Sequence, residues 1–332
     1  MRPFLLNLTL FVFVQLAVAA GILSAYRIDP TAYYLIMARK EQRIKDLPSP
    51  RVIVIGGSTG PFSCDADALA AATGRPTTIL AHHVTLGMTF ILNQATAMMH
   101  DNTGKQPDLY LFSLEYSLLG KHRNTDPSAM TELLAYHQSG LLRIGVEGGK
   151  QFMDSAHILC GRILRRSLRL HLRGTKRELS PSRGPYYRLE SFAPEGNIRP
   201  ELLLADHTKA NQDLPIGADS RSIQQASQAL KRFAETIRGN GNELVIVLPA
   251  LPDHVYKQNE AKLNPILDAL QDSGIPILND RSSIPSDPNT FLDTVYHRNR
   301  AGMELQTQRV ITGLRAAVAS GAIAPLPGLM AP

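Results

Sequence analysis

The stretch Arg51-Val-Ile-Val-Ile55, followed directly by Gly-Gly-Ser-Thr-Gly at positions 56–60, decides the fold of this chain. A short β-branched run between a proline and a glycine is typical of a strand buried on both faces of a parallel sheet. Similar apolar runs occur at 76–80, 109–114, 243–248 and 275–278, and helical patterns lie between them at 65–73, 86–100, 222–238, 260–273 and 301–319. Strands that alternate with helices predict an α/β domain with a doubly wound, mainly parallel, five-stranded sheet that binds ligands at the carboxyl ends of its strands.

The first 27 residues are predicted to anchor the chain in a membrane. No charged residue occurs from Phe4 to Tyr26, and this run exceeds the roughly 20 residues needed to span the hydrocarbon core of a bilayer. Residues 17–19, Ala-Val-Ala, resemble a signal-peptide cleavage site, so a cleaved leader is the alternative. Charge by itself favours a cytoplasmic location for the domain that follows, because Arg2 is outnumbered by Arg27, Arg39, Lys40, Arg43 and Lys45.

Prolines, glycines and composition divide the rest of the chain. A helical connector at 28–50 ends in Leu-Pro-Ser-Pro, and the folded domain is expected at 51–320. The segment at about 121–217 interrupts the alternation, with helical patterns at 127–144 and 149–172, and is interpreted as a helical insertion that could shape a substrate groove. The Ala/Pro/Gly-rich tail at 321–332 is predicted to be flexible.

Composition limits the classes of partner. Hydrophobic residues make up 44% and charged residues 19%, as in a globular protein, and the net charge of +6 is too dispersed to indicate a nucleic-acid surface. Cys64 and Cys160 lie in no zinc-binding pattern and are either separate buried thiols or a disulfide. One concentrated basic run could lie on anionic lipid headgroups or form a solvated helix face; it contains Arg162, Arg165, Arg166, Arg169, Arg173, Lys176 and Arg177.

Three residues predict nucleophilic catalysis. Ser58 follows the first strand, where glycines allow a tight turn and backbone N–H groups can face a substrate. A hydroxyl needs a base, and His297, just before the last helix, can take the serine proton while Asp293 holds the imidazole in its reactive tautomer. A spacing of four residues would bring the last two side chains together if the backbone turns helically.

This order of residues resembles that of the SGNH (GDSL-like) hydrolases, from about Arg51 to Leu314. The first family block, Gly-Asp-Ser, corresponds to Gly56-Gly57-Ser58. The last block has Asp three residues before His, whereas the spacing here is four, so Asp287 is the substitute for Asp293. The resemblance implies a serine esterase or acyltransferase that uses Ser58, Asp293 and His297 and needs no cofactor.

The same resemblance implies donors for an oxyanion. The glycine of the second block corresponds to Gly87 in His83-Val-Thr-Leu-Gly87, and Gly57 lies beside the nucleophile. In place of the family's third block, which supplies an asparagine, stands Ser113-Leu-Glu-Tyr116, so Tyr116 or Asn93 would have to act as the donor.

An N-terminal anchor with a Leu-Glu-Tyr block looks more like the cell-envelope acyl-transfer branch of that family, such as the D-alanine-transfer and alginate O-acetylation proteins, than like secreted lipases. This likeness implies an inner-membrane, single-pass protein with a periplasmic or extracytoplasmic domain. Its substrates would be an acylated glycan or acyl donor, and a membrane-bound O-acyltransferase would be its partner.

Three alternatives remain open. Gly56-x-Ser58-x-Gly60 matches the nucleophile elbow of α/β-hydrolases, although there the serine follows a strand in the middle of the sheet. The same turn resembles a nucleotide-binding loop but lacks the G-x-G-x-x-G spacing. Without the third-block asparagine, the domain could also be a catalytically silent scaffold or glycan-binding partner of a membrane transferase.

Other polar residues follow the predicted strands. His82 and His83 could contact substrate, but adjacent histidines diverge and do not favour a metal site. Glu115 could be a second acid or a solvated carboxylate, and a structural hydrogen bond is favoured; Asp253 and His254 are candidate substrate contacts at the same edge of the sheet.

Overall fold

A computed structural model describes residues 9–11, 13, 14, 17, 33–82, 84, 87–119, 186, 189–204, 214, 216 and 220–330. The chain divides into two compact units, 1–36 with 126–190 and 37–125 with 191–332. Most of the first unit lies outside the described residues, including the predicted insertion helices and the basic run at 162–177. Nearly all of the described residues belong to the second unit.

A parallel sheet of four strands forms the centre of this unit, in the order β2-β1-β3-β4. Its strands are β1 (Val52–Gly56), β2 (Thr77–Ala81), β3 (Leu109–Ser113) and β4 (Glu243–Val247). Every residue of β1, β2 and β3 is buried, as the apolar runs predict for a sheet that is covered on both faces. The fold class is therefore α/β with a parallel sheet.

The predicted fifth strand at 275–278 is not a full strand. It makes one parallel bridge, between Ile277 and Ile246 of β4, where Ile246 N–H donates to Pro276 O at 2.8 Å and Leu278 N–H donates to Ile246 O at 2.9 Å. Proline at 276 has no N–H to continue the ladder, which explains why pairing stops there. A separate two-stranded ladder joins β5 (Leu251–Pro252) to β6 (Pro285–Ser286).

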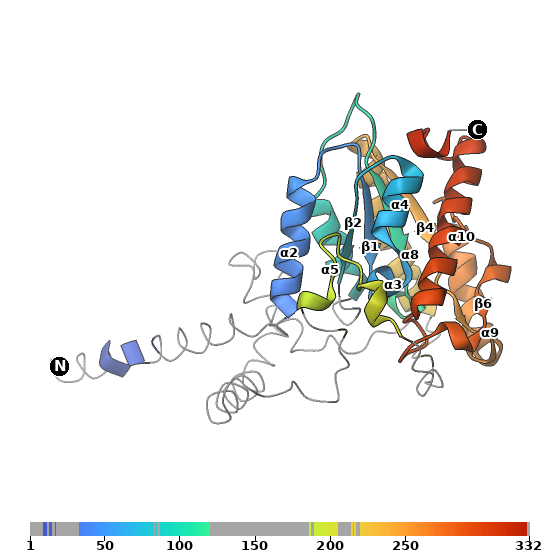
Figure 1. Ribbon diagram of the computed structural model, residues 1–332, viewed down its shortest axis with the longest axis horizontal. Coiled ribbons are helices and arrows are strands. Elements are labelled where there is room, and N and C mark those ends of the chain that lie inside the picture. Colours follow the sequence, from blue (N-terminus) through green and yellow to red (C-terminus); the bar gives the residue numbers. More distant parts are fainter. Residues whose placement is uncertain are drawn as a thin grey trace. The chain divides into compact units, whose positions relative to one another are not determined.

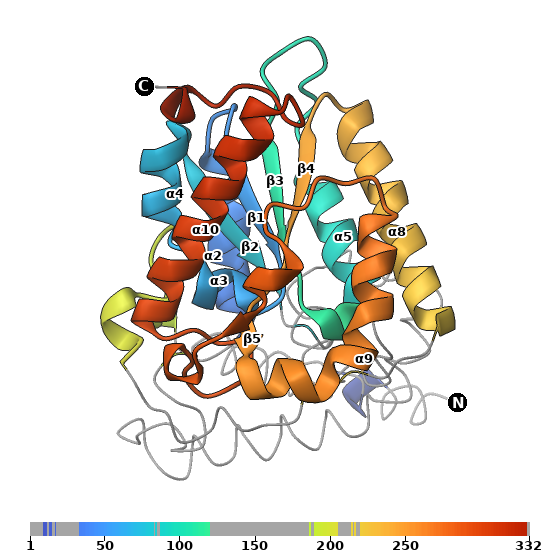
Figure 2. The ribbon, with the colours of Figure 1, turned by 90° about the vertical axis from the view of Figure 1, so that its right-hand side faces the viewer.

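Helices cover both faces of the sheet (Figure 1, Figure 2). The helices α4 and α10 share one apolar core with alternate residues of the strands, among them Val52 and Val54 of β1. The helices α5 and α8 pack together on the other face, and α2 lies on that side (Figure 1). From residue 33 onward, the α-helices that the structure describes are α2 (Tyr33–Asp46), α3 (Thr59–Ser63), α4 (Ala66–Thr73), α5 (Gly87–Ala97), α8 (Ser220–Gly239), α9 (Asp253–Gln271) and α10 (Arg300–Ala319).

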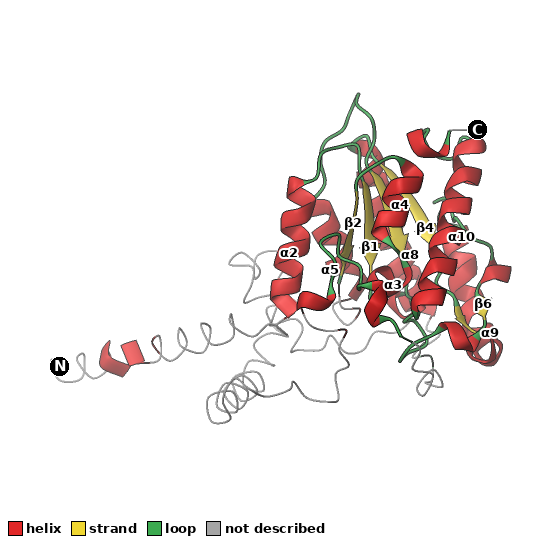
Figure 3. Ribbon diagram, viewed as in Figure 1, coloured by secondary structure: helices red, strands yellow, loops and turns green. Residues whose placement is uncertain are grey.

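Short one-turn helices and loops connect these elements (Figure 3). The 3-10 helices are η2 (Tyr116–Leu118), η4 (Leu189–Ser191), η5 (Pro200–Leu202), η7 (Arg281–Ser283), η8 (Pro288–Thr290) and η9 (Pro327–Leu329). Part of the predicted insertion, 191–204, covers the free edge of β2, because Ile79 N–H donates to Glu195 O at 2.7 Å and Thr78 Oγ1 donates to the same oxygen at 3.0 Å. This part of the chain therefore completes the core and protects an edge strand.

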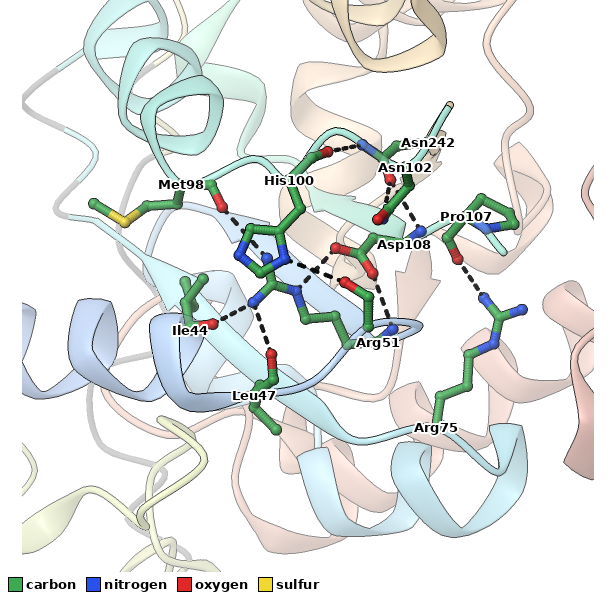
Figure 4. A network of polar contacts seen from close by, with 11 residues as sticks. Ile44, Leu47, Arg51, Arg75, Met98, His100, Asn102, Pro107, Asp108 and Asn242 are labelled. Atoms are coloured by element: carbon green, nitrogen blue, oxygen red, sulfur yellow. Dashed lines mark hydrogen bonds and ion pairs between the residues drawn. The ribbon is translucent and has the colours of Figure 1, made fainter. Parts of the chain in front are cut away.

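A buried polar network holds the amino-terminal edge of the sheet (Figure 4). Arg51 and Asp108 are fully buried, and Arg51 Nε lies 2.9 Å from Asp108 Oδ2. The guanidinium also donates to the carbonyl oxygens of Ile44, Leu47 and Met98. One cation therefore joins β1, the neighbouring strand β3 and the carboxyl ends of α2 and α5, at the edge opposite the predicted catalytic residues.

The predicted anchor at 1–27 lies for the most part outside the described residues, and no helix among the residues that are described is long and apolar enough to cross a membrane. The tail, predicted to be flexible, is packed against the domain through Leu326, whereas Met330 is 60% exposed. Leu326 is fully buried, and Arg75 Nη2 donates to Pro325 O at 3.3 Å, so apolar residues among the prolines attach the tail to the domain.

Candidate active site

Ser58 occupies a sharp turn between β1 and α3, at the carboxyl edge of the sheet. The turn depends on Gly56, whose φ of +138° is open to glycine but strained for other residues. A Cβ at this position would also lie 3.0 Å from the backbone carbon of Ser113 in β3. The close approach of β1 and β3 therefore requires glycine at the end of β1 and turns the chain so that Ser58 is partly exposed.

The structure brings together the three residues that were predicted to act on a substrate. His297 Nε2 lies 2.9 Å from Ser58 Oγ, and His297 Nδ1 lies 2.7 Å from Asp293 Oδ1. The imidazole is almost fully buried, whereas the Asp293 side chain is 29% exposed. This is the geometry in which a base can accept a serine proton while a carboxylate accepts the Nδ1 hydrogen.

A closed loop, and not a helical turn, brings Asp293 to His297. Phe291 and Arg298 pair as an antiparallel bridge, and Leu292 N–H donates to His297 O at 2.8 Å. Inside the loop Thr294 Oγ1 accepts hydrogen bonds from two backbone N–H groups, that of His297 at 3.1 Å and that of Tyr296 at 3.2 Å. The backbone does not turn helically here, and the bridge and the threonine bring the two side chains together instead.

Packing holds this loop against the domain. The Phe62 ring of α3 stacks on the His297 ring with centroids 3.8 Å apart and an angle of 6° between the planes. Below the loop, the buried Arg298 guanidinium lies 4.4 Å from the Phe291 ring centre and donates to Thr290 Oγ1 at 2.7 Å. Burial lowers the pKa of Arg298 to about 9. The imidazole is thus fixed in orientation by an aromatic face and by a rigid loop.

Glu115 is the residue at this site whose contact was not predicted. The Ser58 hydroxyl lies 2.9 Å from Glu115 Oε1, and Thr59 N–H donates to the same oxygen at 3.2 Å. The side chain is buried, and burial raises the pKa of the Glu115 carboxyl although its hydrogen bond with Ser58 and the charge of His297 lower it. The strand register could have revealed the contact, because Gly56 pairs with Ser113, and Ser58 and Glu115 each lie two residues further on.

Glycine at position 57 is explained by the same carboxyl group. A Cβ at Gly57 would lie 2.7 Å from Glu115 Cδ and closer still to Oε1. Glu115 thus fills the space that a side chain at position 57 would need, so glycine fits at this position.

The predicted oxyanion residues have different surroundings. Gly87 begins α5 with a φ of +79°, and among the described residues nothing lies within 4 Å of the place that its Cβ would take. Asn93 is exposed on the same helix. The Tyr116 hydroxyl donates to Pro249 O at 2.9 Å, so its hydrogen is directed away from Ser58. Of these residues Gly87 keeps open space around it, and the geometry does not favour Tyr116 as a donor.

Other predicted candidates lie elsewhere. The Asp287 side chain accepts from Asn289 N–H at 2.9 Å, so it caps η8 and does not substitute for Asp293. Asp253 Oδ2 forms a surface ion pair with Lys257 Nζ at 2.7 Å. Cys64 is a free thiol in the core, and burial raises its pKa to about 12. His82 is buried at the end of β2, while His83 and Cys160 lie outside the described residues.

The described part of the chain contains no group of three or more His, Cys, Asp or Glu side chains arranged to hold a metal ion. A surface hollow lies at the amino-terminal edge of the sheet, lined by residues that include Arg238, Asn242 and Glu243. It does not include Ser58, which lies at the opposite edge, so we do not assign substrate binding to it.

No protein-family model, curated protein or solved structure matches this sequence. The geometry around Ser58 is therefore what indicates a function for this chain.

Proposed function

We propose that this chain is a serine-dependent enzyme of the SGNH type, which transfers an acyl group to an extracytoplasmic polysaccharide or another envelope glycan, or hydrolyses an ester on it. The observation that carries the proposal is the continuous contact from Ser58 Oγ through His297 to Asp293, with distances of 2.9 and 2.7 Å. The order of the elements supports it, because the serine follows the first strand of a parallel sheet and the other two residues precede the last long helix.

The first half of the reaction follows from these contacts. Ser58 Oγ forms a bond to the acyl carbon while its proton passes to His297 Nε2. Asp293 accepts the Nδ1 hydrogen and stabilises the imidazolium that forms. His297 then gives the proton to the oxygen of the leaving group, and the bond from that oxygen to the acyl carbon breaks, which leaves an ester on Ser58. A positioned base of this kind contributes roughly 10²–10⁴-fold to the rate.

The second half uses the same residues in reverse order. His297 takes a proton from an acceptor hydroxyl, whose oxygen attacks the ester carbon, and Ser58 recovers its proton as the bond to Oγ breaks. Water as the acceptor gives hydrolysis, and a sugar hydroxyl gives transfer. The balance between these outcomes depends on how well the bound sugar excludes water from the imidazole.

A membrane location is part of this proposal. The side chains of Leu10, Phe11, Phe13 and Val14 are between 46% and 68% exposed, and a cluster of exposed apolar side chains is costly in water and stable in lipid. The likeness to cell-envelope acyl-transfer proteins supports an inner-membrane anchor, an extracytoplasmic domain and a membrane-bound O-acyltransferase as partner. Protease added to intact spheroplasts should digest the domain, and protection from the protease would contradict this orientation.

The test of the enzymatic proposal uses the full chain in detergent and an active-site probe. A fluorophosphonate should label the wild type and fail to label Ser58→Ala. With an acetyl ester as substrate, both Ser58→Ala and His297→Ala should lose turnover, and addition of an oligosaccharide should divert the acetyl group from water to sugar if the enzyme is a transferase. A wild type that is folded yet neither labels nor turns over would overturn the proposal.

A silent scaffold is the second candidate, and one observation favours it. Glu115 stands where the family has an asparagine donor, and its carboxyl group contacts the nucleophile itself. A scaffold would bind an oligosaccharide with the same affinity in the wild type and in Ser58→Ala, and would not react with the probe.

A further inference from the structure

The Ser58 hydroxyl lies between two groups that both accept hydrogen bonds. Glu115 Oε1 and His297 Nε2 are each 2.9 Å from Ser58 Oγ. At 2.9 Å each contact has the length of a real hydrogen bond, so each needs a hydrogen between the two heavy atoms. Two such contacts therefore need two hydrogens.

One serine hydroxyl carries one hydrogen and can satisfy only one of the two contacts. If Glu115 and Asp293 were both ionised and His297 neutral, the three contacts from Glu115 through Ser58 and His297 to Asp293 would have two hydrogens between them, and one contact would bring two lone pairs to within 2.9 Å of each other. The observed distances therefore require one more proton, and with Asp293 ionised, as in a serine triad, either the Glu115 carboxyl or the imidazole holds it. In the first form the Glu115 O–H donates to Ser58 and Ser58 donates to His297; in the second the imidazolium donates to Ser58 and Ser58 donates to the carboxylate.

The two forms have the same net charge but differ in how many charges are buried. The form with neutral Glu115 and neutral His297 has two fewer ionised groups, and both side chains are nearly inaccessible to water, at 2% and 5% exposure. Burial of ionised groups is costly, so this environment favours the neutral form. It is also the reactive form, because only a neutral imidazole can accept the serine proton.

We propose that Glu115 is a further catalytic residue, which shares one proton with the Ser58–His297 pair. Through this proton it keeps the Ser58 O–H directed toward His297 Nε2. The inference rests on the proposed function and adds a regulation of the same nucleophile. While the proton is present, Ser58 gives its own hydrogen to His297 during attack and Glu115 keeps its proton throughout. When the proton is lost, ionised Glu115 is the stronger acceptor, takes the hydrogen bond of Ser58 and holds the nucleophile back.

The groups that face Glu115 come from three elements, and they set the direction of its pH response. Ser58 and Thr59 contact it from the end of β1 and the start of α3, and His297 faces it from the loop at 291–298. Tyr296 of the same loop lies close enough for the carboxyl charge to raise the tyrosine pKa, although burial raises it more. Of these neighbours only His297 can carry a positive charge. As the pH rises the shared proton leaves and Glu115 ionises, so the rate at which Ser58 reacts should fall.

The experiment compares the wild type with Glu115→Gln across neutral and alkaline pH, with the full chain in detergent. The readout is the rate of fluorophosphonate labelling of Ser58. In the wild type the rate should fall about tenfold on the alkaline side, because an ionised acceptor holds a hydrogen roughly twice as strongly as a neutral one. Glutamine cannot ionise, so the rate for Glu115→Gln should stay level over the same range.

Glu243→Gln is the matched control. Burial also raises the pKa of the Glu243 carboxyl, which accepts from Ala324 N–H at 2.7 Å at the opposite edge of the sheet. This variant should keep the wild-type pH profile. An alkaline decrease in rate that persists in Glu115→Gln would overturn the inference, and so would a wild-type rate that stays level. Because the second outcome needs only the wild type, the test holds even if Glu115→Gln fails to fold.

A second measurement separates this inference from the proposed function. The infrared carbonyl band of a protonated carboxyl group should be present in the wild type at neutral pH, lost in Glu115→Gln and kept in Glu243→Gln. If Ser58 fails to react with the probe but the band behaves in this way, the enzyme proposal fails and the shared proton stands. If Ser58 reacts and no such band is assigned to Glu115, the shared proton is refuted and the enzyme proposal stands.

Discussion

Substitution of Gly57 by alanine should lower the rate at which Ser58 reacts, although Glu115 and His297 are both still present in the variant. The new methyl group would lie 2.7 Å from Glu115 Cδ, whereas carbon atoms pack at about 3.5 Å or more. The carboxyl group must therefore retreat by about 0.8 Å, because it is the end of a flexible side chain and the methyl group is fixed to the backbone. Gly57 has no positive φ, so alanine fits the backbone itself.

The size of the effect follows from that displacement. The Ser58–Glu115 contact is 2.9 Å, and a retreat of about 0.8 Å carries it past the roughly 3.5 Å at which a hydrogen bond is lost. Loss of one hydrogen bond to the reacting oxygen costs about 1.4 kcal/mol, which is about a tenfold lower rate. The rate of fluorophosphonate labelling of Ser58 at neutral pH measures this directly and requires no knowledge of the natural substrate.

A double-mutant cycle of Gly57→Ala and Glu115→Ala tests whether the alanine acts through the carboxyl group. With Glu115→Ala the group that the methyl displaces is absent, so adding Gly57→Ala should change the labelling rate by less than about twofold. The coupling between the two positions is then about 1.4 kcal/mol, close to the whole effect of the single change. Additive effects, with the same tenfold loss in both backgrounds, would refute the reasoning, because they would mean that alanine acts on the turn and not on the carboxyl group.

Three further predictions concern other parts of the structure. Asp293→Asn should lower the labelling rate by about 10³-fold or more through loss of the reactive tautomer, whereas Asp287→Asn should leave it unchanged; equal losses would reassign the acid. Arg51→Leu should lower the free energy of unfolding in urea by about 3–5 kcal/mol, because it leaves the buried Asp108 carboxylate uncompensated, and a change below about 1 kcal/mol would contradict this. Burial raises the folded-state pKa of Glu115 above its ordinary value of 4.5, so the folded state binds this proton more tightly than the unfolded chain and loses that stability as the pH rises through the folded pKa. Over this rise in pH the melting temperature of the wild type should therefore fall relative to that of Glu115→Gln. A constant difference between the two melting temperatures would contradict the shifted pKa.

Most of the secondary structure was predictable because buried positions must be apolar, and they recur along the chain at the intervals typical of strands and helices. The four strands lie within one residue of the predicted runs, since a strand covered on both faces must be apolar throughout. The helix α9 begins seven residues earlier than predicted, at Asp253, because its first turns carry polar residues that blur the apolar period. The fifth strand was overpredicted, since an apolar run at 275–278 does not reveal that Pro276 interrupts pairing.

The candidate site was predictable in part for a similar reason. The residue types of Ser58, Asp293 and His297 and their positions relative to strands and helices are properties of the linear chain, as are the apolar periods that define an α/β domain. Which carboxylate meets the imidazole was decided by the bridge between Phe291 and Arg298, a pairing that no local pattern encodes.

The sequence by itself therefore determined the class of fold, the bounds of the four strands in its central sheet to within one residue, and the three side chains proposed for the chemistry. Only the tertiary structure decided that Glu115 lies against Ser58, that Gly57 is glycine because of it, and that Tyr116 donates its hydrogen to Pro249 instead. The physical reason is that the apolar character of each residue indicates whether it is buried, and buried runs form the strands. A contact across 57 residues depends instead on the register of β1 with β3.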